Sequence, residues 1–225
     1  MANYCIWSDL QIPFEHPRAL EFCKYLYRHF KCTEVLCVGD EVDNLHGGLY
    51  PKDPDALHSP IGELKAAREK LSEWFKTFPH VRVAISNHGN RWIKKASMAE
   101  IPSQLLRTYQ EVLGIPETWR YADQWLIKEK HPFLMNHGMD LGGKTPYRQA
   151  AELSTVSRLF GHLHTSAGIA YVRTIEKFVW GFNVGCLIDR KAYAFKYASN
   201  QKFEATCGAG VILNEGALPI WIPID

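Results

Sequence analysis

The stretch that decides the fold is residues 35–44, VLCVGDEVDN, in which four apolar residues run into a Gly-Asp pair and a further acidic residue. A short apolar run that ends in glycine and polar residues predicts a buried β-strand followed by a loop. Four other segments have the same form and end next to Asp, Asn or His: residues 4–8, 81–85, 133–135 and 159–160. We therefore expect polar side chains at the ends of five successive strands.

Helical patterns lie between the first three of these strands. Residues 17–30 open with Pro17 and carry apolar residues at helical spacing, and residues 59–78 repeat the pattern. This alternation predicts an α/β sheet with covered faces. From about residue 168 the pattern changes to short strands (IAYV, KFVWGF, AYAFKY, GVIL and LPIWI), which predict a second, mostly antiparallel sheet packed on the first. Since no linker, repeat or charge run interrupts the chain, residues 1–225 are expected to form a single domain.

The composition narrows the class of protein. The chain has 225 residues, of which 46% are hydrophobic and 22% charged, and these ordinary values exclude disorder or low complexity for the whole chain. A formal net charge of +2 gives no support to a dedicated nucleic-acid-binding protein. Six cysteines without a C-x-x-C pair are expected to be reduced core residues. With neither a signal-peptide pattern nor a membrane-length apolar run, we expect a cytoplasmic protein without a membrane partner.

The polar residues at the strand ends form a chemically coherent set. They are Asp9, Asp40, Asp43, Asn87, His88, His137, His162 and His164. In open α/β sheets, ligands bind at the carboxyl ends of the strands. Carboxylates and imidazoles without a thiolate suit Mn²⁺, Fe²⁺, Co²⁺ or Zn²⁺ and disfavour a structural zinc site. Two such ions about 3.5–4 Å apart can hold a phosphoryl group, and Asp40 is placed to bridge them.

In their order along the chain, these motifs resemble those of the calcineurin-like metallophosphoesterase family. The family pattern D-x-H, G-D-x-x-D, G-N-H-[DE], H, G-H-x-H corresponds here to Asp9-Leu10-Gln11, residues 39–43, Ser86-Asn87-His88-Gly89, His137 and Gly161-His162-Leu163-His164. The chain is also similar to a phage and prophage subgroup that includes deoxynucleoside monophosphatase-type enzymes, in Lys52-Asp53-Pro54, in Arg91 and in residues 185–189. The resemblance implies an α/β fold of two packed mixed β-sheets flanked by helices.

The resemblance also implies a role for each matching residue. His88 would donate to the leaving oxygen or stabilise the phosphoryl charge, Asp43 would orient His88, and Arg91 would bind the substrate. Two divalent metal ions are implied, with Mn²⁺ expected first and Mg²⁺, Co²⁺, Ni²⁺, Zn²⁺ or Fe²⁺ as alternatives. One ion would take Asp9, Asp40 and His164, and the other Asp40, Asn87, His137 and His162. Gln11 is the remaining candidate ligand.

Three positions leave alternatives open. Gln11 replaces a histidine of the family pattern, and a neutral amide oxygen is a poorer ligand for zinc-like metals, so the first site is expected to be weaker. Gln11 as a plain surface residue is the other interpretation. Gly89 replaces an acidic residue that would orient the site. Arg91 is either a phosphate clamp or a solvated cation at the start of a helix.

The expected function is hydrolysis of a small phosphomonoester, a (deoxy)nucleoside monophosphate in the first place, by in-line attack of a metal-bound hydroxide. The enzyme would act in the cytoplasm, that of the host if it is phage-encoded. One alternative is a phosphodiesterase or nuclease, for which Arg91, Lys94, Lys95 and Arg107 are the candidate basic cluster. The other is a non-catalytic scaffold that has lost a metal. Trp92, Trp180 and Tyr147 are candidates to stack on a base, although core packing is the commoner use of tryptophan.

Overall fold

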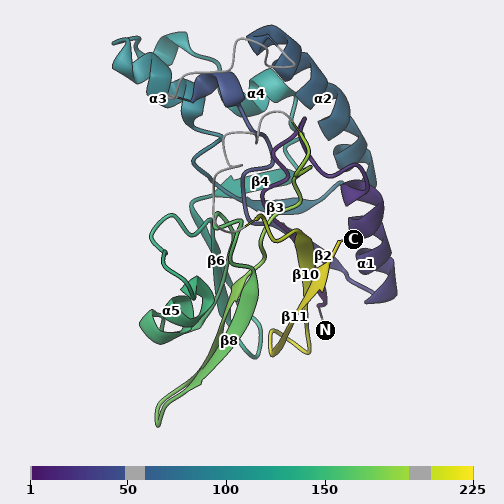
Figure 1. The fold of residues 1–225 in the computed structure, drawn as a ribbon, viewed down its shortest axis with the longest axis vertical. Coiled ribbons are helices and arrows are strands. Elements are labelled where there is room, and N and C mark those ends of the chain that lie inside the picture. Colours follow the sequence, from purple (N-terminus) through teal and green to yellow (C-terminus); the bar gives the residue numbers. More distant parts are fainter. Residues whose placement is uncertain (1, 49–58, 193–203, 225) are drawn as a thin grey trace.

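In the computed structural model, which describes residues 2–48, 59–192 and 204–224, two mixed β-sheets pack face to face and helices cover their outer sides (Figure 1). This architecture confirms the predicted fold class.

The first sheet has six strands, of which the central ones are parallel. Strand β1 is parallel to β2, β2 to β3 and β3 to β4, whereas β10 and β11 run antiparallel on the other side of β1. Their spatial order is β11 (Leu218–Pro223), β10 (Gly208–Leu213), β1 (Tyr4–Trp7), β2 (Glu34–Cys37), β3 (Val81–Ala84) and β4 (Trp119–Ala122).

The second sheet has five strands. Its three inner strands, β6, β7 and β9, are parallel to one another, and β5 and β8 are antiparallel at the two edges. Their spatial order is β5 (Gln124–Ile127), β6 (Phe133–Asn136), β7 (Ser157–Phe160), β9 (Phe178–Asn183) and β8 (Gly168–Arg173).

The helices lie outside the sheets. Helices α1 (Ala19–His29) and α2 (Pro60–Thr77) cover the first sheet, and α5 (Pro146–Leu153) packs on the second. The short elements between β2 and β4 gather at one end of the molecule, next to α2 (Figure 1). They are η1 (Leu45–Gly47), α3 (Arg91–Met98), η2 (Ser103–Leu105) and α4 (Tyr109–Leu113).

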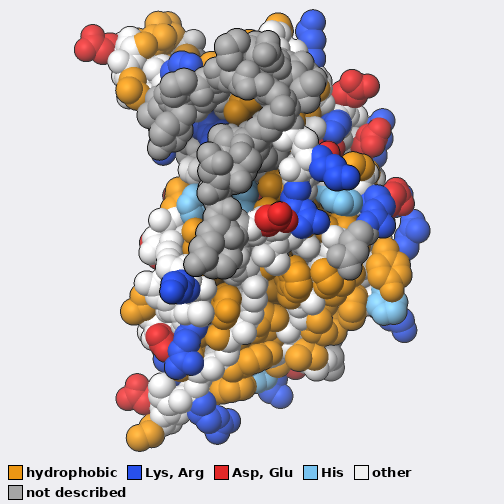
Figure 2. All heavy atoms as spheres, in the orientation of Figure 1, with side chains coloured by type: hydrophobic (Ala, Val, Ile, Leu, Met, Phe, Trp, Pro, Cys, Tyr) orange, Lys and Arg blue, Asp and Glu red, His pale blue; other side chains and the backbone are white. Residues whose placement is uncertain are grey.

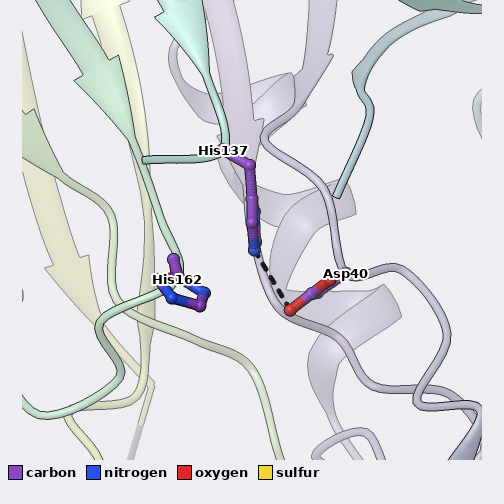
Figure 3. Close-up of side chains that lie close together, drawn as sticks. All are labelled: Asp40, His137 and His162. Carbon is purple, nitrogen blue, oxygen red and sulfur yellow. Dashed lines mark ion pairs between the residues drawn. The ribbon is translucent and has the colours of Figure 1, made fainter. Parts of the chain in front are cut away.

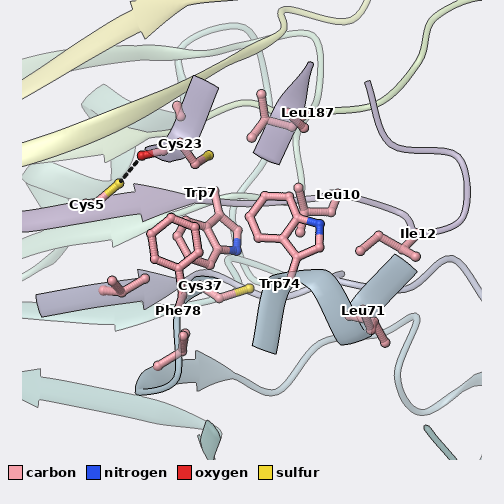
Figure 4. Close-up of a cluster of buried hydrophobic side chains, with 14 of the residues drawn as sticks. Cys5, Trp7, Leu10, Ile12, Cys23, Cys37, Leu71, Trp74, Phe78 and Leu187 are labelled. Carbon is pink, nitrogen blue, oxygen red and sulfur yellow. Dashed lines mark hydrogen bonds between the residues drawn. The ribbon is translucent and has the colours of Figure 1, made fainter. Parts of the chain in front are cut away.

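Strand alternation divides the core into two layers. Cys5 and Trp7 of β1 point towards α1 and α2, whereas Tyr4 and Ile6 of the same strand point between the two sheets. Figure 4 shows the helix-side layer, in which the ring centroids of Trp7 and Trp74 lie 5.0 Å apart. Because β1 and residues 35–37 of β2 are buried on both faces, these segments are continuous apolar runs.

Several sequence-based expectations need correction. The strands after residue 168 do not form a sheet of their own, because β8 and β9 complete the second sheet while β10 and β11 extend the first. Helix α1 begins at Ala19, so Pro17 precedes it. Most of the AYAFKY segment, as well as Lys52-Asp53-Pro54, lies outside the described residues. The expectation for the cysteines is confirmed, since all six are free and buried.

The surface drawn in Figure 2 shows hydrophobic side chains gathered over β10 and β11. Among the described residues, no helix has the length and hydropathy needed to cross a membrane.

Candidate metal centre and active site

The predicted site residues meet where strands of the two facing sheets end. Asp9 and Asp40 follow β1 and β2 of the first sheet, and His137 and His164 follow β6 and β7 of the second. Contacts cross between the sheets at this point: His137 Nε2 lies 3.1 Å from Asp40 Oδ2, and His164 Nε2 lies 2.8 Å from Asp9 Oδ1. These side chains meet because the strands that precede them are parallel within each sheet, so that their carboxyl ends lie at the same edge of that sheet.

The loops that carry these side chains have unusual backbone geometry. Asp9, Gln11, Asp40 and His162 have φ values of 51°, 53°, 52° and 68°, in the left-handed region that costs a non-glycine residue free energy. Backbone hydrogen bonds from Asp9 N to Gly39 O and from Gln11 N to Asp40 O, both 2.9 Å, hold two of these loops together. Strain that is retained at four residues of one cluster is typical of a functional site.

Asp40, His137 and His162 form a group able to hold a metal ion (Figure 3). One ligand atom of each lies within 4.8 Å of the others. Asn87 completes the group, because its Oδ1 lies 2.9 Å from His137 Nε2. Asp40 Oδ2 and Asn87 Oδ1 therefore both lie close to Nε2, the ring nitrogen of His137 that could bind an ion.

The protonation states follow from this geometry. Both ring nitrogens of His137 face acceptors, since Nδ1 also lies 2.8 Å from the carbonyl oxygen of Val38. Burial lowers the pKa of His137, but the charge and hydrogen bond of Asp40 outweigh it and raise the pKa to about 9. Burial also acts to raise the pKa of Asp40, yet the charge and hydrogen bond of His137 and a hydrogen bond from Ser86 hold it well below its usual value. Burial, together with the charge of His137, lowers the pKa of His162 and favours its neutral, ligating form.

A second candidate group lies beside the first: Asp9 and His164 are in contact, and Gln11 contacts Asp40. Asp9 is fully buried, and its Oδ2 accepts hydrogen bonds from the His162 backbone N–H (3.0 Å) and from the Ser8 hydroxyl. Burial lowers the pKa of His164, but the nearby Asp9 carboxylate outweighs it and raises the pKa.

Gln11 is not a surface residue, because its side chain is 0% exposed. Its Nε2 donates to Asp40 Oδ2 at 3.4 Å, and its Oε1 is buried without a hydrogen-bond partner among the described residues. A buried carbonyl oxygen without a partner is costly and calls for an explanation. A cation held with Asp9, Asp40 and His164 would satisfy it, so the residues present fit a metal ion.

His88, Asp43 and Arg91 form a connected trio next to Asp40. Nδ1 of His88 lies 2.8 Å from the carbonyl oxygen and 2.9 Å from Oδ1 of Asp43. Arg91 donates from Nη1 to the same carbonyl at 2.7 Å and from Nη2 to His88 Nε2 at 2.7 Å. Arg91 is the first residue of α3, but it is not simply a solvated cation, because its guanidinium is held by Asp43.

This trio defines the tautomer of His88. A guanidinium only donates hydrogen bonds, so His88 Nε2 accepts and the ring proton lies on Nδ1. In this state His88 cannot donate from Nε2 to a leaving oxygen. The role that the resemblance implies therefore requires Arg91 to leave Nε2 when substrate binds.

Gly89 makes room for a tyrosine that the sequence alone did not single out. A Cβ added at Gly89 would lie 3.3 Å from Cζ of Tyr109. The Tyr109 hydroxyl donates to the buried carboxylate of Glu41, as does that of Tyr121 at 2.9 Å. Burial raises the pKa of Glu41. The only sequence signal for this cluster is that Glu41 lies between two residues of the GDEVDN motif.

The candidate base-stacking residues separate into different environments. Trp180 is buried between the sheets, where its Nε1 donates to the carbonyl oxygen of Gly216 at 2.9 Å. Tyr147 packs against Gly168 in the contact between α5 and β8. Trp92 lines a cavity, and its side chain is exposed.

Comparisons with known proteins give structural similarity at low sequence identity. No protein-family profile matches the chain, and no curated protein sequence matches it. Yfce, described as a phosphoesterase from E. coli, is similar over 99% of this chain and 100% of its own, with a TM-score of 0.48 and 18% identity. A metallophosphoesterase from Sphaerobacter thermophilus covers 100% of this chain and 88% of its own (TM-score 0.48, 13% identity). Vacuolar protein sorting 29 from Cryptosporidium parvum covers 98% and 89% (TM-score 0.48, 12% identity).

Proposed function

We propose that this protein is a divalent-metal-dependent phosphoesterase that hydrolyses a small phosphomonoester, in the first place a (deoxy)nucleoside monophosphate. The observation that carries the proposal is the buried Asp40 carboxylate. Its Oδ2 lies 3.1 Å from His137 Nε2 and accepts a hydrogen bond from Gln11 Nε2 at 3.4 Å. A buried carboxylate in contact with both candidate groups suits a bridge between two cations.

The two groups supply different ligands. One ion, for which Mn²⁺ is the first expectation, would be held by Asp40, Asn87, His137 and His162. The other would be held by Asp9, Gln11, Asp40 and His164. When bound, the ions supply positive charge to the phosphoryl oxygens and lower the pKa of a water molecule. The second group is the weaker one, because Gln11 offers a neutral oxygen where an imidazole would donate more strongly.

His88, Asp43 and Arg91, the trio beside Asp40, act on the phosphoryl group and on the leaving group. The planar, forked guanidinium of Arg91 suits two phosphoryl oxygens and is within reach of them once it leaves His88. Once Arg91 has left, His88 Nε2 is free to take up a proton from solvent, and the resulting imidazolium donates that proton to the departing oxygen while Asp43 holds the ring through Nδ1–H. In this order of events, Asp43 positions the His88 ring, and His88 and Arg91 contact the substrate.

A nuclease or phosphodiesterase is less well supported than a monoesterase. Nucleic-acid backbones need a basic track along the protein surface. Of the four candidate cations, Arg91 is bound to Asp43, and Lys95 donates to the carbonyl oxygen of His46 at 3.1 Å. Arg107 lies outside α3 and donates to the carbonyl oxygen of Glu111 at 3.5 Å. These contacts do not form a continuous track.

The test is turnover by protein that has been stripped with a chelator and reloaded with a single metal. Phosphate release is measured on a panel of nucleoside monophosphates, p-nitrophenol release on bis-p-nitrophenyl phosphate, and strand shortening on single-stranded DNA, each with Mn²⁺, Mg²⁺, Co²⁺, Ni²⁺ or Zn²⁺. We expect metal-dependent hydrolysis of monoesters by the wild type and none by His137→Ala. Diester or DNA cleavage without monoester hydrolysis would favour the nuclease alternative. No turnover by a metal-loaded protein would favour a non-catalytic scaffold.

A further inference from the structure

A cavity of about 220 Å³ lies between α2, α3 and α4. These three helices gather at one end of the molecule (Figure 1). The walls of the cavity include Ile12 and Asn44 from the loops after β1 and β2, Leu64 from α2, Trp92 from α3 and Tyr109 from α4. No residue that we assign to the metal ions, nor His88, lines it. It is therefore distinct from the metal centre.

The cavity nevertheless adjoins the active site on the side of His88. Asn44 Nδ2 donates to the backbone carbonyl oxygen of His88 at 2.9 Å. Tyr109 packs against Gly89, which follows His88, and Ile12 follows Gln11 in the chain. Two lining residues, Asn44 and Tyr109, thus contact the backbone of His88 and Gly89, next to the side chain at which we place the leaving oxygen.

The lining suits an uncharged, planar group. Trp92 and Tyr109 contribute aromatic surfaces, and most other lining residues are aliphatic. Two charged side chains line the cavity, Arg107 and Glu63, and the Glu63 carboxylate already accepts from the backbone N–H groups of Leu45 (2.6 Å) and His46 (3.3 Å). Among the described lining residues, a cationic ligand would therefore find no free counterion to offset the hydration that it loses.

The size of the cavity limits the ligand further. Pockets for drug-sized molecules begin at about 300 Å³. A cavity of about 220 Å³ is smaller and suits one ring system rather than a whole nucleotide. The phosphoryl group would then remain outside, at the metal centre.

We propose that this cavity binds the planar ring of the leaving group, the base of a nucleoside monophosphate, with Trp92 stacking on it. The assignment deepens the proposed phosphomonoesterase function and rests on it for the position of the phosphoryl group. Stacking of a base on an aromatic side chain contributes enough affinity for a truncation to be measured.

Two variants test the cavity, and a third is their control. Trp92→Ala removes the stacking surface at a position that is 40% exposed, and Val112→Phe fills the cavity from α4. Leu105→Ala shortens an apolar side chain that is 76% exposed in the same region and does not line the cavity. The measured quantity is the ratio of kcat/KM for thymidine 5′-monophosphate to kcat/KM for ribose 5-phosphate, with Mn²⁺ present.

We expect this ratio to fall by about ten-fold in Trp92→Ala and in Val112→Phe and to stay at the wild-type value in Leu105→Ala. A wild-type ratio in Trp92→Ala, with circular dichroism confirming that the variant is folded, would overturn the assignment of the cavity and leave the phosphomonoesterase function intact.

A binding measurement separates the cavity from catalysis. Thymidine, which has no phosphate, is titrated into chelator-stripped protein and followed by NMR chemical-shift changes of the Trp92 indole N–H. We expect saturable binding by the wild type that is weakened about ten-fold in Val112→Phe, and equally strong binding by Leu105→Ala. Absence of thymidine binding would overturn the cavity assignment. Binding without hydrolysis of any phosphomonoester would support the cavity and refute the proposed function.

Discussion

In the metal-free protein, a proton on His137 Nε2 occupies the place where we propose a metal ion. Replacing Asp40 by asparagine should remove this proton. His137 Nε2 faces Asp40 Oδ2 at 3.1 Å and Asn87 Oδ1 at 2.9 Å, the two oxygens that we propose as ligands of the same ion. A metal ion needs the neutral imidazole, so it must displace this proton. Asp40→Asn removes the charge that holds the proton there.

The size of the effect follows from the distance. Unit charges 3.1 Å apart attract each other by about 5 kcal/mol at an effective dielectric constant of about 20. The rise in the pKa of His137 from 6.5 to about 9 corresponds to about 3 kcal/mol, because burial opposes the attraction. Without the Asp40 charge, burial remains and only the Asp9 charge and the Val38 hydrogen bond oppose it, so the pKa of His137 should fall from about 9 towards its ordinary value.

The sign of the pH dependence follows from the same shift. A raised histidine pKa contributes stability in full below pH 6.5, and this contribution of about 3 kcal/mol is lost as the pH rises through about 9. Metal binding has the opposite dependence. At pH 7 the proton on His137 should weaken Mn²⁺ binding about 100-fold relative to binding above pH 9, and each ion bound should release a proton.

The assay combines an NMR titration of the His137 ring with calorimetry of Mn²⁺ binding in buffers of different ionisation enthalpy. Asp123→Asn, which neutralises an exposed carboxylate after β4, is the matched control and should titrate like the wild type. The reasoning is refuted if His137 in Asp40→Asn still titrates near pH 9, or if Mn²⁺ binding to the wild type at pH 7 releases no proton.

Three further variants test other parts of the site. His88→Ala should lower kcat by about 10²–10⁴ while metal content, measured by mass spectrometry, stays unchanged, and loss of metal would instead make His88 a ligand. Gln11→His should tighten binding at the site of Asp9 and shift its preference towards Zn²⁺ or Co²⁺ in calorimetric titrations, whereas equal affinity before and after the change would remove Gln11 from the ligand set. Tyr109→Phe takes one of two phenol donors from buried Glu41 and should lower the free energy of unfolding in urea by about 1–3 kcal/mol; an unchanged midpoint would show that this hydrogen bond does not stabilise the fold.

Local patterns were enough to predict the strands that carry the candidate site. A polar residue directly after a short apolar run is visible in the sequence, and parallel strands place such residues at one edge. Asp9, Asp40, His137 and His164 do lie together in the structure for this reason.

Strand partners could not be predicted in the same way. Strand β10 pairs with β1, with Ile212 opposite Tyr4, although about 200 residues separate them along the chain. Alternation shows that a segment is a strand but does not show which strand lies beside it. The expected second sheet was wrong because the two C-terminal strand pairs, β8 with β9 and β10 with β11, join different sheets.

Partners of buried polar residues also depend on distant parts of the chain. Gln11 is polar, so its complete burial follows only from how the loops after β1 and β2 pack together. Glu41 is buried because Tyr109 and Tyr121, more than 60 residues later, bring hydroxyl groups to it. Neither fact has a local signal in the sequence.

The central claim is that two groups of ligands meet at Asp40 and hold divalent metal ions. Crystals grown with Mn²⁺ and measured near its absorption edge test this claim most directly through the anomalous difference map. We predict one strong peak in contact with Asp40, Asn87, His137 and His162, and a weaker peak in contact with Asp9, Gln11, Asp40 and His164. A map from Mn²⁺-saturated crystals with no peak in contact with Asp40 would contradict the account.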